Sequence, residues 1–148
     1  MPIRFAYHPG NVAHSSAPEV DETMRAACRS LDIELIDMPG ATSCGAGILG
    51  QANRRLQITL NARTMSIAED LGMDIITPCA TTAATLYEDL MMLKADSGLM
   101  GEVNRTLEKT TGRVLEGSIK IRHLLQVIME DIGIENFSKK VGSSSHFS

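Results

Sequence analysis

Residues 3–10 read Ile-Arg-Phe-Ala-Tyr-His-Pro-Gly, a short apolar run that ends at a Pro-Gly pair. Such a run is typical of a buried β-strand followed by a turn. Two later segments repeat the pattern: Ile-Glu-Leu-Ile at 33–36, before Pro39, and Met-Asp-Ile-Ile-Thr at 73–77, before Pro78. The sequence therefore predicts three strands, at Ile3–Tyr7, Ile33–Ile36 and Met73–Thr77.

Helical patterns lie between and after these strands. Apolar residues recur every three or four positions from Pro18 to Leu31, which predicts an amphipathic helix. A second helix is expected over Ala52–Leu71, with or without a break, ending at Gly72. Ser118–Ile121 is interpreted as a fourth strand or an extended lead-in. Further helices are expected at Leu86–Leu93, around Val103 and Leu107, and from Ile121 to Ile132.

Strands that alternate with helices indicate an α/β fold with a parallel-dominated sheet and flanking helices. We expect a single domain over residues 3–141, followed by a disordered tail at 142–148 that is rich in serine. In such a sheet the loops after the strands gather at one end, where binding sites form. Here those loops are residues 9–14, 39–47 and 78–82.

Composition narrows the class of protein. The 148 residues suit one domain, and the formal net charge of −4 argues against a nucleic-acid-binding surface. No apolar run approaches the roughly 18 residues that span a bilayer, and no signal peptide is recognisable. Three cysteines, an odd number, do not form the disulfide framework of a small secreted fold. The composition favours a reducing, cytoplasmic compartment.

The same three loops hold recognisable motifs. They are Tyr-His-Pro-Gly-Asn at 7–11, Ser-Cys-Gly at 43–45 and Pro-Cys-Ala-Thr-Thr at 78–82. Asn-Ala-Arg at 61–63 and Ile-Arg-His-Leu-Leu at 121–125 accompany them. Over about Ile3 to Val141 the chain resembles the cysteine-rich CCG domain of the B-type subunits of heterodisulfide reductases. A related domain occurs in the E-type subunit of some succinate dehydrogenases. The order and spacing of the loops both fit this family.

The resemblance implies an iron–sulfur cofactor, because five cysteines in these motifs hold a noncubane cluster in the family. Here only Cys44 and Cys79 remain, and Asn11, Ser43 and Thr82 occupy the positions of the other three. Side-chain oxygen and amide groups are poor ligands for iron–sulfur chemistry. Cys44 and Cys79 are therefore the candidate residual cofactor and metal positions, and we expect the cluster to be absent or incomplete. No catalytic residue is assigned.

By the same resemblance, the chain is a component of an electron-transfer or disulfide-reductase complex, an oxidoreductase subunit that is not active alone. Its partners would be the other subunits, through which a cytoplasmic protein could associate with a membrane. The family joins two such domains in tandem, and this sequence contains one. One alternative is a redox-inactive interaction or assembly module that keeps only the fold. Another is a small thiol protein that pairs Cys44 with Cys79.

The remaining cysteine and the histidines have their own interpretations. Cys28 lies on the apolar face of its helix and is expected to be a packed core thiol. Cys44 and Cys79 are expected as neighbours in a partly exposed pocket, with Cys79 the more acidic because it opens a helix. His8 and His14 flank the loop of Asn11 and leave a metal site open, while His123 is a helix-start residue, an interface residue or a ligand.

Overall fold

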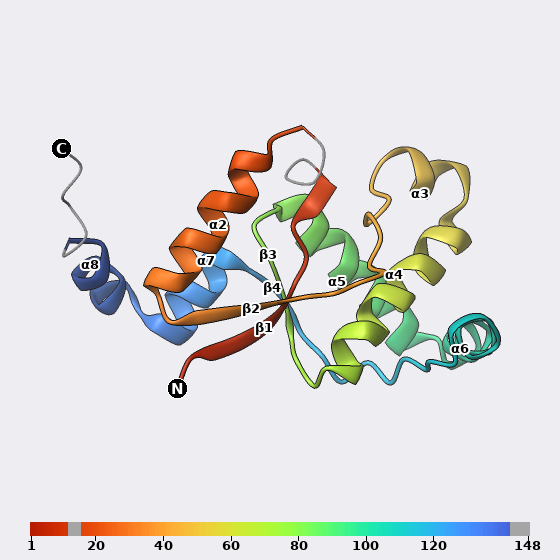
Figure 1. Ribbon diagram of the computed structural model, residues 1–148. Helices are drawn as coiled ribbons and strands as arrows, with labels where there is room; N and C mark the ends of the chain where they lie inside the picture. Colours follow the sequence, from red (N-terminus) through yellow and green to blue (C-terminus); the bar gives the residue numbers. More distant parts are fainter. Residues whose placement is uncertain (12–15, 143–148) are drawn as a thin grey trace.

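A computed structural model describes residues 1–11 and 16–142 and contains one four-stranded parallel sheet (Figure 1). The strand order is β2-β1-β3-β4, and every neighbouring pair is parallel. The strands are β1 (Ile3–Tyr7), β2 (Ile33–Asp37), β3 (Ile75–Thr77) and β4 (Ile121–His123). The predicted α/β fold with a parallel sheet is confirmed.

Helices cover both faces of the sheet. One face carries α2 (Pro18–Ser30), α7 (Leu124–Val127), the π-helical turn η1 (Ile128–Ile132) and α8 (Ile134–Gly142). The other face carries α3 (Ile48–Ala52), α4 (Arg54–Asp70), α5 (Ala80–Ala95) and α6 (Ser97–Thr111). Figure 1 shows α2 and α7 on one side of the strands and α4, α5 and α6 on the other. The protein is thus a three-layer α/β structure.

Two hydrophobic cores follow from the two-residue period of the strands. Phe5 and Tyr7 of β1 point toward α2 and α7, whereas Ala6 between them points toward α4 and α5. Ile75 and Ile76 of β3 divide between the two cores in the same way. Because both faces are buried, the central strands consist almost entirely of apolar residues, as parallel strands usually do.

The end of the chain differs from the expectation. The predicted helix from Ile121 is wrong at its start, because Ile121–His123 is strand β4 and α7 begins only at Leu124. The residues just before β4 donate several backbone N–H groups to carboxylates. Ser118 N–H donates to Glu69 Oε1 at 2.6 Å, and Lys120 N–H donates to Asp74 Oδ1 at 2.8 Å. These hydrogen bonds between residues far apart in the sequence, rather than the local apolar spacing, determine the structure at this point.

The structure refines one of the helices predicted from the sequence and adds another. A break does interrupt the helix expected at Ala52–Leu71, at Asn53, whose side chain accepts the Leu56 N–H at 3.0 Å and caps α4. The helix α8 was not predicted. Residues 143–148 lie outside the described residues, so the domain limits 3–141 and the tail 142–148 stay predictions. None of the helices in the described ranges is long and apolar enough to cross a membrane.

The carboxylate of Glu69 anchors the segment that leads into β4. It accepts hydrogen bonds from Glu116 N–H at 2.7 Å and from the Ser118 N–H and hydroxyl. We expect Glu69→Ala to lower the free energy of unfolding by about 1–2 kcal/mol, because backbone donors lose a charged acceptor. Asp70→Ala is the control, since it removes only an exposed ion pair with Arg113 and should change stability by less than about 1 kcal/mol. Equal effects in urea unfolding would contradict this role.

Candidate functional site

The topology leaves a crevice at the carboxyl ends of the strands. After β1 the chain turns to α2 on one face, whereas after β2 and β3 it turns to α4 and α5 on the other. Loops that diverge in this way open the crevice in which α/β proteins bind ligands. The motif residues of the loops at 9–11, 39–47 and 78–82 therefore gather around the end of β1.

Gly10 and Cys79 make the tightest contact in this crevice. Gly10 has φ +80, and a Cβ placed on it would lie 2.7 Å from the Cβ of Cys79. The same point lies 3.5 Å from Cys79 Sγ and 3.6 Å from Thr82 Oγ1. Only glycine combines this backbone conformation with so close an approach. The loops after β1 and β3 are therefore in direct contact.

Thr82 connects the two candidate thiols. Cys79 is the N-cap of α5, and its Sγ accepts the Thr82 N–H at 3.5 Å. The Thr82 hydroxyl lies 3.6 Å from Cys44 Sγ and donates to it. Cys79 is half-buried, but Cys44 is only 1% exposed. Cys44 and Cys79 are thus neighbours through Thr82, whereas the expectation that both lie in a partly exposed pocket is wrong for Cys44.

A buried polar network holds the loop of Cys44 from the core side. The Asn61 side-chain amide donates to the Cys44 carbonyl at 2.9 Å and to Asp89 Oδ2 at 2.6 Å. Asp89 is fully buried, and it also accepts from Gln57 Nε2 at 3.3 Å and pairs with Arg54 at 2.7 Å. Sequence reasoning missed Asp89. A signal was present, because this carboxylate lies three residues after Leu86, on the apolar stripe of α5.

The two described histidines of the motifs use both ring nitrogens within the fold. His8 Nδ1 accepts the Gly10 N–H at 3.1 Å, so its Nε2 carries the proton and donates to the Thr42 carbonyl at 2.9 Å. His123 caps α7 through Nδ1, and its Nε2 lies 3.0 Å from the Pro78 carbonyl. Of the three interpretations of His123, the helix-start residue is confirmed. His14 lies outside the described residues.

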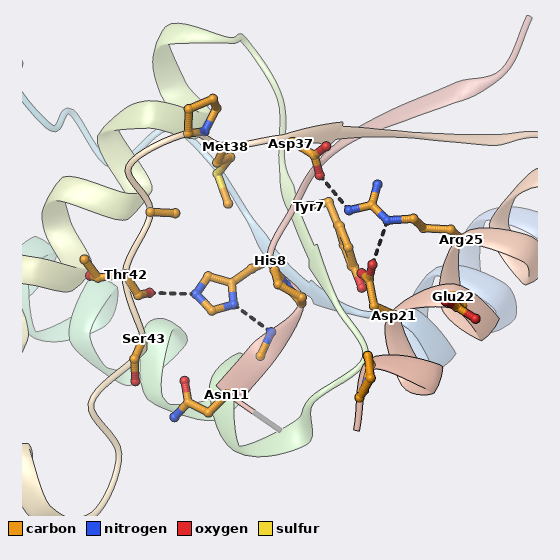
Figure 2. A pocket seen from close by; sticks show the side chains of 15 residues that line it. Tyr7, His8, Asn11, Asp21, Glu22, Arg25, Asp37, Met38, Thr42 and Ser43 are labelled. Atoms are coloured by element: carbon orange, nitrogen blue, oxygen red, sulfur yellow. Dashed lines mark hydrogen bonds and ion pairs between the residues drawn. The ribbon is translucent and has the colours of Figure 1, made fainter. Parts of the chain in front are cut away.

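A cavity of about 690 Å³ lies between the ends of β1 and β2 and the start of α2, and its lining includes Gly10 and Ser43 (Figure 2). Asn11 and Ser43 lie on its wall, at the side away from Arg25. The Ser43 hydroxyl accepts the Gly45 N–H at 3.1 Å. The structure therefore brings Cys44, Cys79 and Thr82 into contact and places Asn11 and Ser43 on the adjoining cavity.

Arg25 dominates the other wall of this cavity. Its guanidinium donates to Asp21 at 3.0 Å and to Asp37 at 2.8 Å, and it lies 4.8 Å from the centre of the Tyr7 ring. The hydrogen bond to Asp37 is the main reason that the pKa of Arg25 is raised above its usual value. Burial, and then the Asp21 carboxylate, raise the pKa of Tyr7 well above its usual value. This wall therefore holds a neutral phenol and a charged, doubly paired guanidinium.

The side chains present do not fit a cluster of the family type. Two thiols are available where iron–sulfur clusters use several thiolates, and Gly10 and Thr82 fill the space beside them. In residues 1–11 and 16–142, no group of three or more His, Cys, Asp or Glu side chains is placed to hold a metal ion.

Comparison with known proteins agrees with the motifs. The family model of the CCG cysteine-rich domain matches residues 5–87, more than half of the chain. The chain belongs to this family. The resemblance inferred from the loops is confirmed.

Three curated relatives match most of this CCG domain. It is 28% identical over 140 residues to a protein of Archaeoglobus profundus that is named as similar to the heterodisulfide reductase B subunit. It is 24% identical over 127 residues to the B subunit of the ferredoxin/F420H2-dependent CoB-CoM heterodisulfide reductase of Methanosarcina acetivorans. It is 27% identical over 141 residues to the 8-methylmenaquinol:fumarate reductase membrane anchor subunit of Wolinella succinogenes.

These matches cover 94%, 85% and 95% of this chain but only 46%, 42% and 48% of the relatives, in the same order. The chain thus spans less than half the length of the curated relatives it matches. A crystal structure of a hypothetical protein from Helicobacter pylori aligns with a TM-score of 0.76 and 19% identity, over 89% of this chain and 26% of that one. This likeness shows the fold.

The contact of Gly10 with Cys79 should limit the size of residue 10. We expect Gly10→Ala to destabilise the protein by about 1–3 kcal/mol more than Gly112→Ala. Both glycines have positive φ, but a Cβ on Gly112 would meet no atom within 4 Å. Gly112→Ala therefore reports backbone strain alone, about 1 kcal/mol. Thermal or urea unfolding of both variants measures the difference, and equal losses would mean that the two loops separate easily.

The three thiols should differ in reactivity in the native protein. We expect alkylation at neutral pH, followed by mass mapping, to modify Cys79 at least about tenfold faster than Cys44 or Cys28. Cys79 is half-buried, Cys44 is covered, and burial raises the pKa of Cys28 to about 11, so that Cys28 holds its proton. In urea all three should react at similar rates. Modification of Cys28 or Cys44 before Cys79 would contradict the structure.

Proposed function

We propose that this CCG domain is a subunit of a multi-subunit redox complex, of the heterodisulfide reductase B type or the succinate dehydrogenase E type. In that complex it supplies its fold and subunit contacts, and its own iron–sulfur site is degenerate. The relatives that match nearly the whole chain carry the names of reductase subunits. The proposal that the site is degenerate is supported by the position of Thr82, which forms hydrogen bonds with both Cys44 and Cys79.

We further propose that Cys44 and Cys79 are the residual ligand positions and that Asn11, Ser43 and Thr82 occupy lost ones. The local geometry of α5 supports the assignment of Thr82. Cys79 is the N-cap and Thr82 is the third residue of the helix, so both side chains lie at the helix start. A sulfur at position 82 would stand where the hydroxyl now meets Cys44. Thr82 is thus the expected place for a missing thiolate.

The partners in this proposal are the other subunits, which would carry the metal centres and any disulfide-reductase or electron-transfer chemistry. The domain alone would not be an active enzyme. It would lie in the cytoplasm and reach a membrane only through those partners. The described part of the chain contains a buried Cys44 and two histidines whose nitrogens are all engaged, which suits a structural role at this site.

A second candidate is a redox-inactive interaction module that keeps the fold but serves no reductase. The same packing of Cys44 favours it, because a thiol covered to this degree is closed to exchange with other thiols. The two candidates differ in their partners. Purification of the tagged chain at native expression level should recover iron–sulfur reductase or dehydrogenase subunits in the first case. Their consistent absence would leave the interaction module.

Restoring the missing cysteines tests the proposed site. After anaerobic reconstitution with iron and sulfide, the wild-type chain should hold no stoichiometric cluster, because its donors do not suit one. The triple variant Asn11→Cys/Ser43→Cys/Thr82→Cys should bind several irons per chain and gain visible absorbance. Adding Cys44→Ser and Cys79→Ser to the triple variant is the control and should abolish this binding.

Two results would overturn the assignment. A wild-type chain that assembles several irons would refute the degenerate site. Iron bound equally by the triple variant and its control would show that Cys44 and Cys79 are not ligand positions. Circular dichroism of every variant before reconstitution establishes that each is folded.

A further inference from the structure

The fourth strand forms an open edge of the sheet in the described part of the chain. β4 pairs with β3 alone, and the Ile75 N–H donates to the Lys120 carbonyl at 2.9 Å. Because ladder bonds alternate along a parallel strand, the backbone of Arg122 also faces β3. Ile121 between them directs its N–H and C=O away from β3, at an edge that no other strand of the described residues pairs with. Such groups accept another extended chain.

A groove of about 250 Å³ lies at this edge. The residue Tyr87 and its neighbour Met91 form one wall on α5, and Gln126 and Glu130 form the other on α7 and η1. Figure 1 shows α5 and α7 on opposite faces of the sheet, so the edge of β4 lies between the two helical layers. Tyr87 is 54% exposed, which leaves much of its ring uncovered beside the strand.

The groove carries excess positive charge. Lys94 and Lys120 line it and are exposed, and neither forms an ion pair with a residue of the described ranges. Arg122 is already paired with Glu130 at 2.7 Å and with Asp131 at 3.3 Å. The stem of Lys94 packs over Gly117, where a Cβ would lie 3.4 Å from its Cγ. This packing holds one of the two available ammonium groups beside the strand.

We propose that this edge binds an extended acidic segment of a partner subunit. The segment would add to β4 through the outward N–H and C=O of Ile121. Its carboxylates would pair with Lys94 and Lys120, and an apolar side chain would cover Tyr87. This inference rests on the proposed function, in which the domain supplies subunit contacts. Alternatively, the charge of Lys120 protects this edge strand from pairing with other chains. Removing the charge should weaken binding of the acidic segment in the first case and promote self-association in the second.

The test uses the full chain and a defined probe, an eight-residue acetylated and amidated peptide of alternating aspartate and valine. Titration followed by ¹H–¹⁵N NMR should shift the amides of Ile121, Arg122 and Tyr87 and leave α2 unchanged. Lys94→Glu/Lys120→Glu should weaken binding by at least about tenfold. Lys109→Glu/Lys139→Glu is the matched control, because it changes the net charge equally outside the groove and should have little effect.

Two comparator peptides separate charge from backbone recognition. Lysine in place of aspartate should abolish binding through repulsion, and N-methylation of the backbone should weaken it because the probe loses its donors. Equal binding of the acidic and basic peptides would overturn the proposal. So would an unchanged affinity in Lys94→Glu/Lys120→Glu, or self-association of Lys94→Ala/Lys120→Ala without loss of peptide binding, which would establish the guarding role.

The same variants distinguish this inference from the proposed function. If reductase subunits co-purify with the wild type and equally with Lys94→Glu/Lys120→Glu, the docking edge is wrong and the proposed function stands. If the peptide binds in the groove but no redox subunit is recovered, the edge stands and the proposed function is wrong. If the subunits co-purify with the wild type but not with Lys94→Glu/Lys120→Glu, both the docking edge and the proposed function are supported.

Discussion

The contact between Gly10 and Cys79 holds the candidate site together. The loops after β1 and β3 start from paired strands, where the His8 N–H donates to the Ile76 carbonyl at 3.0 Å, but they leave the sheet toward opposite faces. A glycine with positive φ lets the first loop lie against the Cβ of Cys79. That contact fixes the start of α5, and with it Thr82 and the hydrogen bond to Cys44. A larger residue at position 10 would separate all of them.

The side chains of His8 and His123 add contacts between the other loops at the same end of the sheet. His8, after β1, bonds to the loop after β2, and His123, at the end of β4, lies within hydrogen-bonding distance of the loop after β3. In both rings Nδ1 accepts a main-chain N–H two residues later, which places the proton on Nε2. Each of the two histidines therefore connects the ends of two neighbouring strands. Both side chains, which the sequence left open as metal ligands, form contacts between loops in this structure.

The sequence predicted the features that depend on local pattern. Apolar runs ended by proline or glycine located β1, β2 and β3, and the three- and four-residue spacing located α2 and Cys28 on its buried face. The failures arose where distant residues decide. Ile121 continues the apolar spacing of Leu125 and Ile128, yet it is a strand residue, because Glu69 and Asp74 bind the backbone of the segment that leads into β4. Burial of Cys44 likewise depends on Thr82, 38 residues away.

Asp89 is the part of the site that sequence reasoning missed, although its place on the apolar stripe of α5 was a signal. Its ion pair joins a fully buried carboxylate to an Arg54 side chain that is 39% exposed, and the cost of removing the carboxylate from water offsets much of the attraction. Its contribution here is positional. Arg54 and Gln57 hold the carboxylate, the carboxylate holds Asn61, and Asn61 holds the carbonyl of Cys44. The loop after β2 is thus held from the core by this chain of hydrogen bonds and one ion pair.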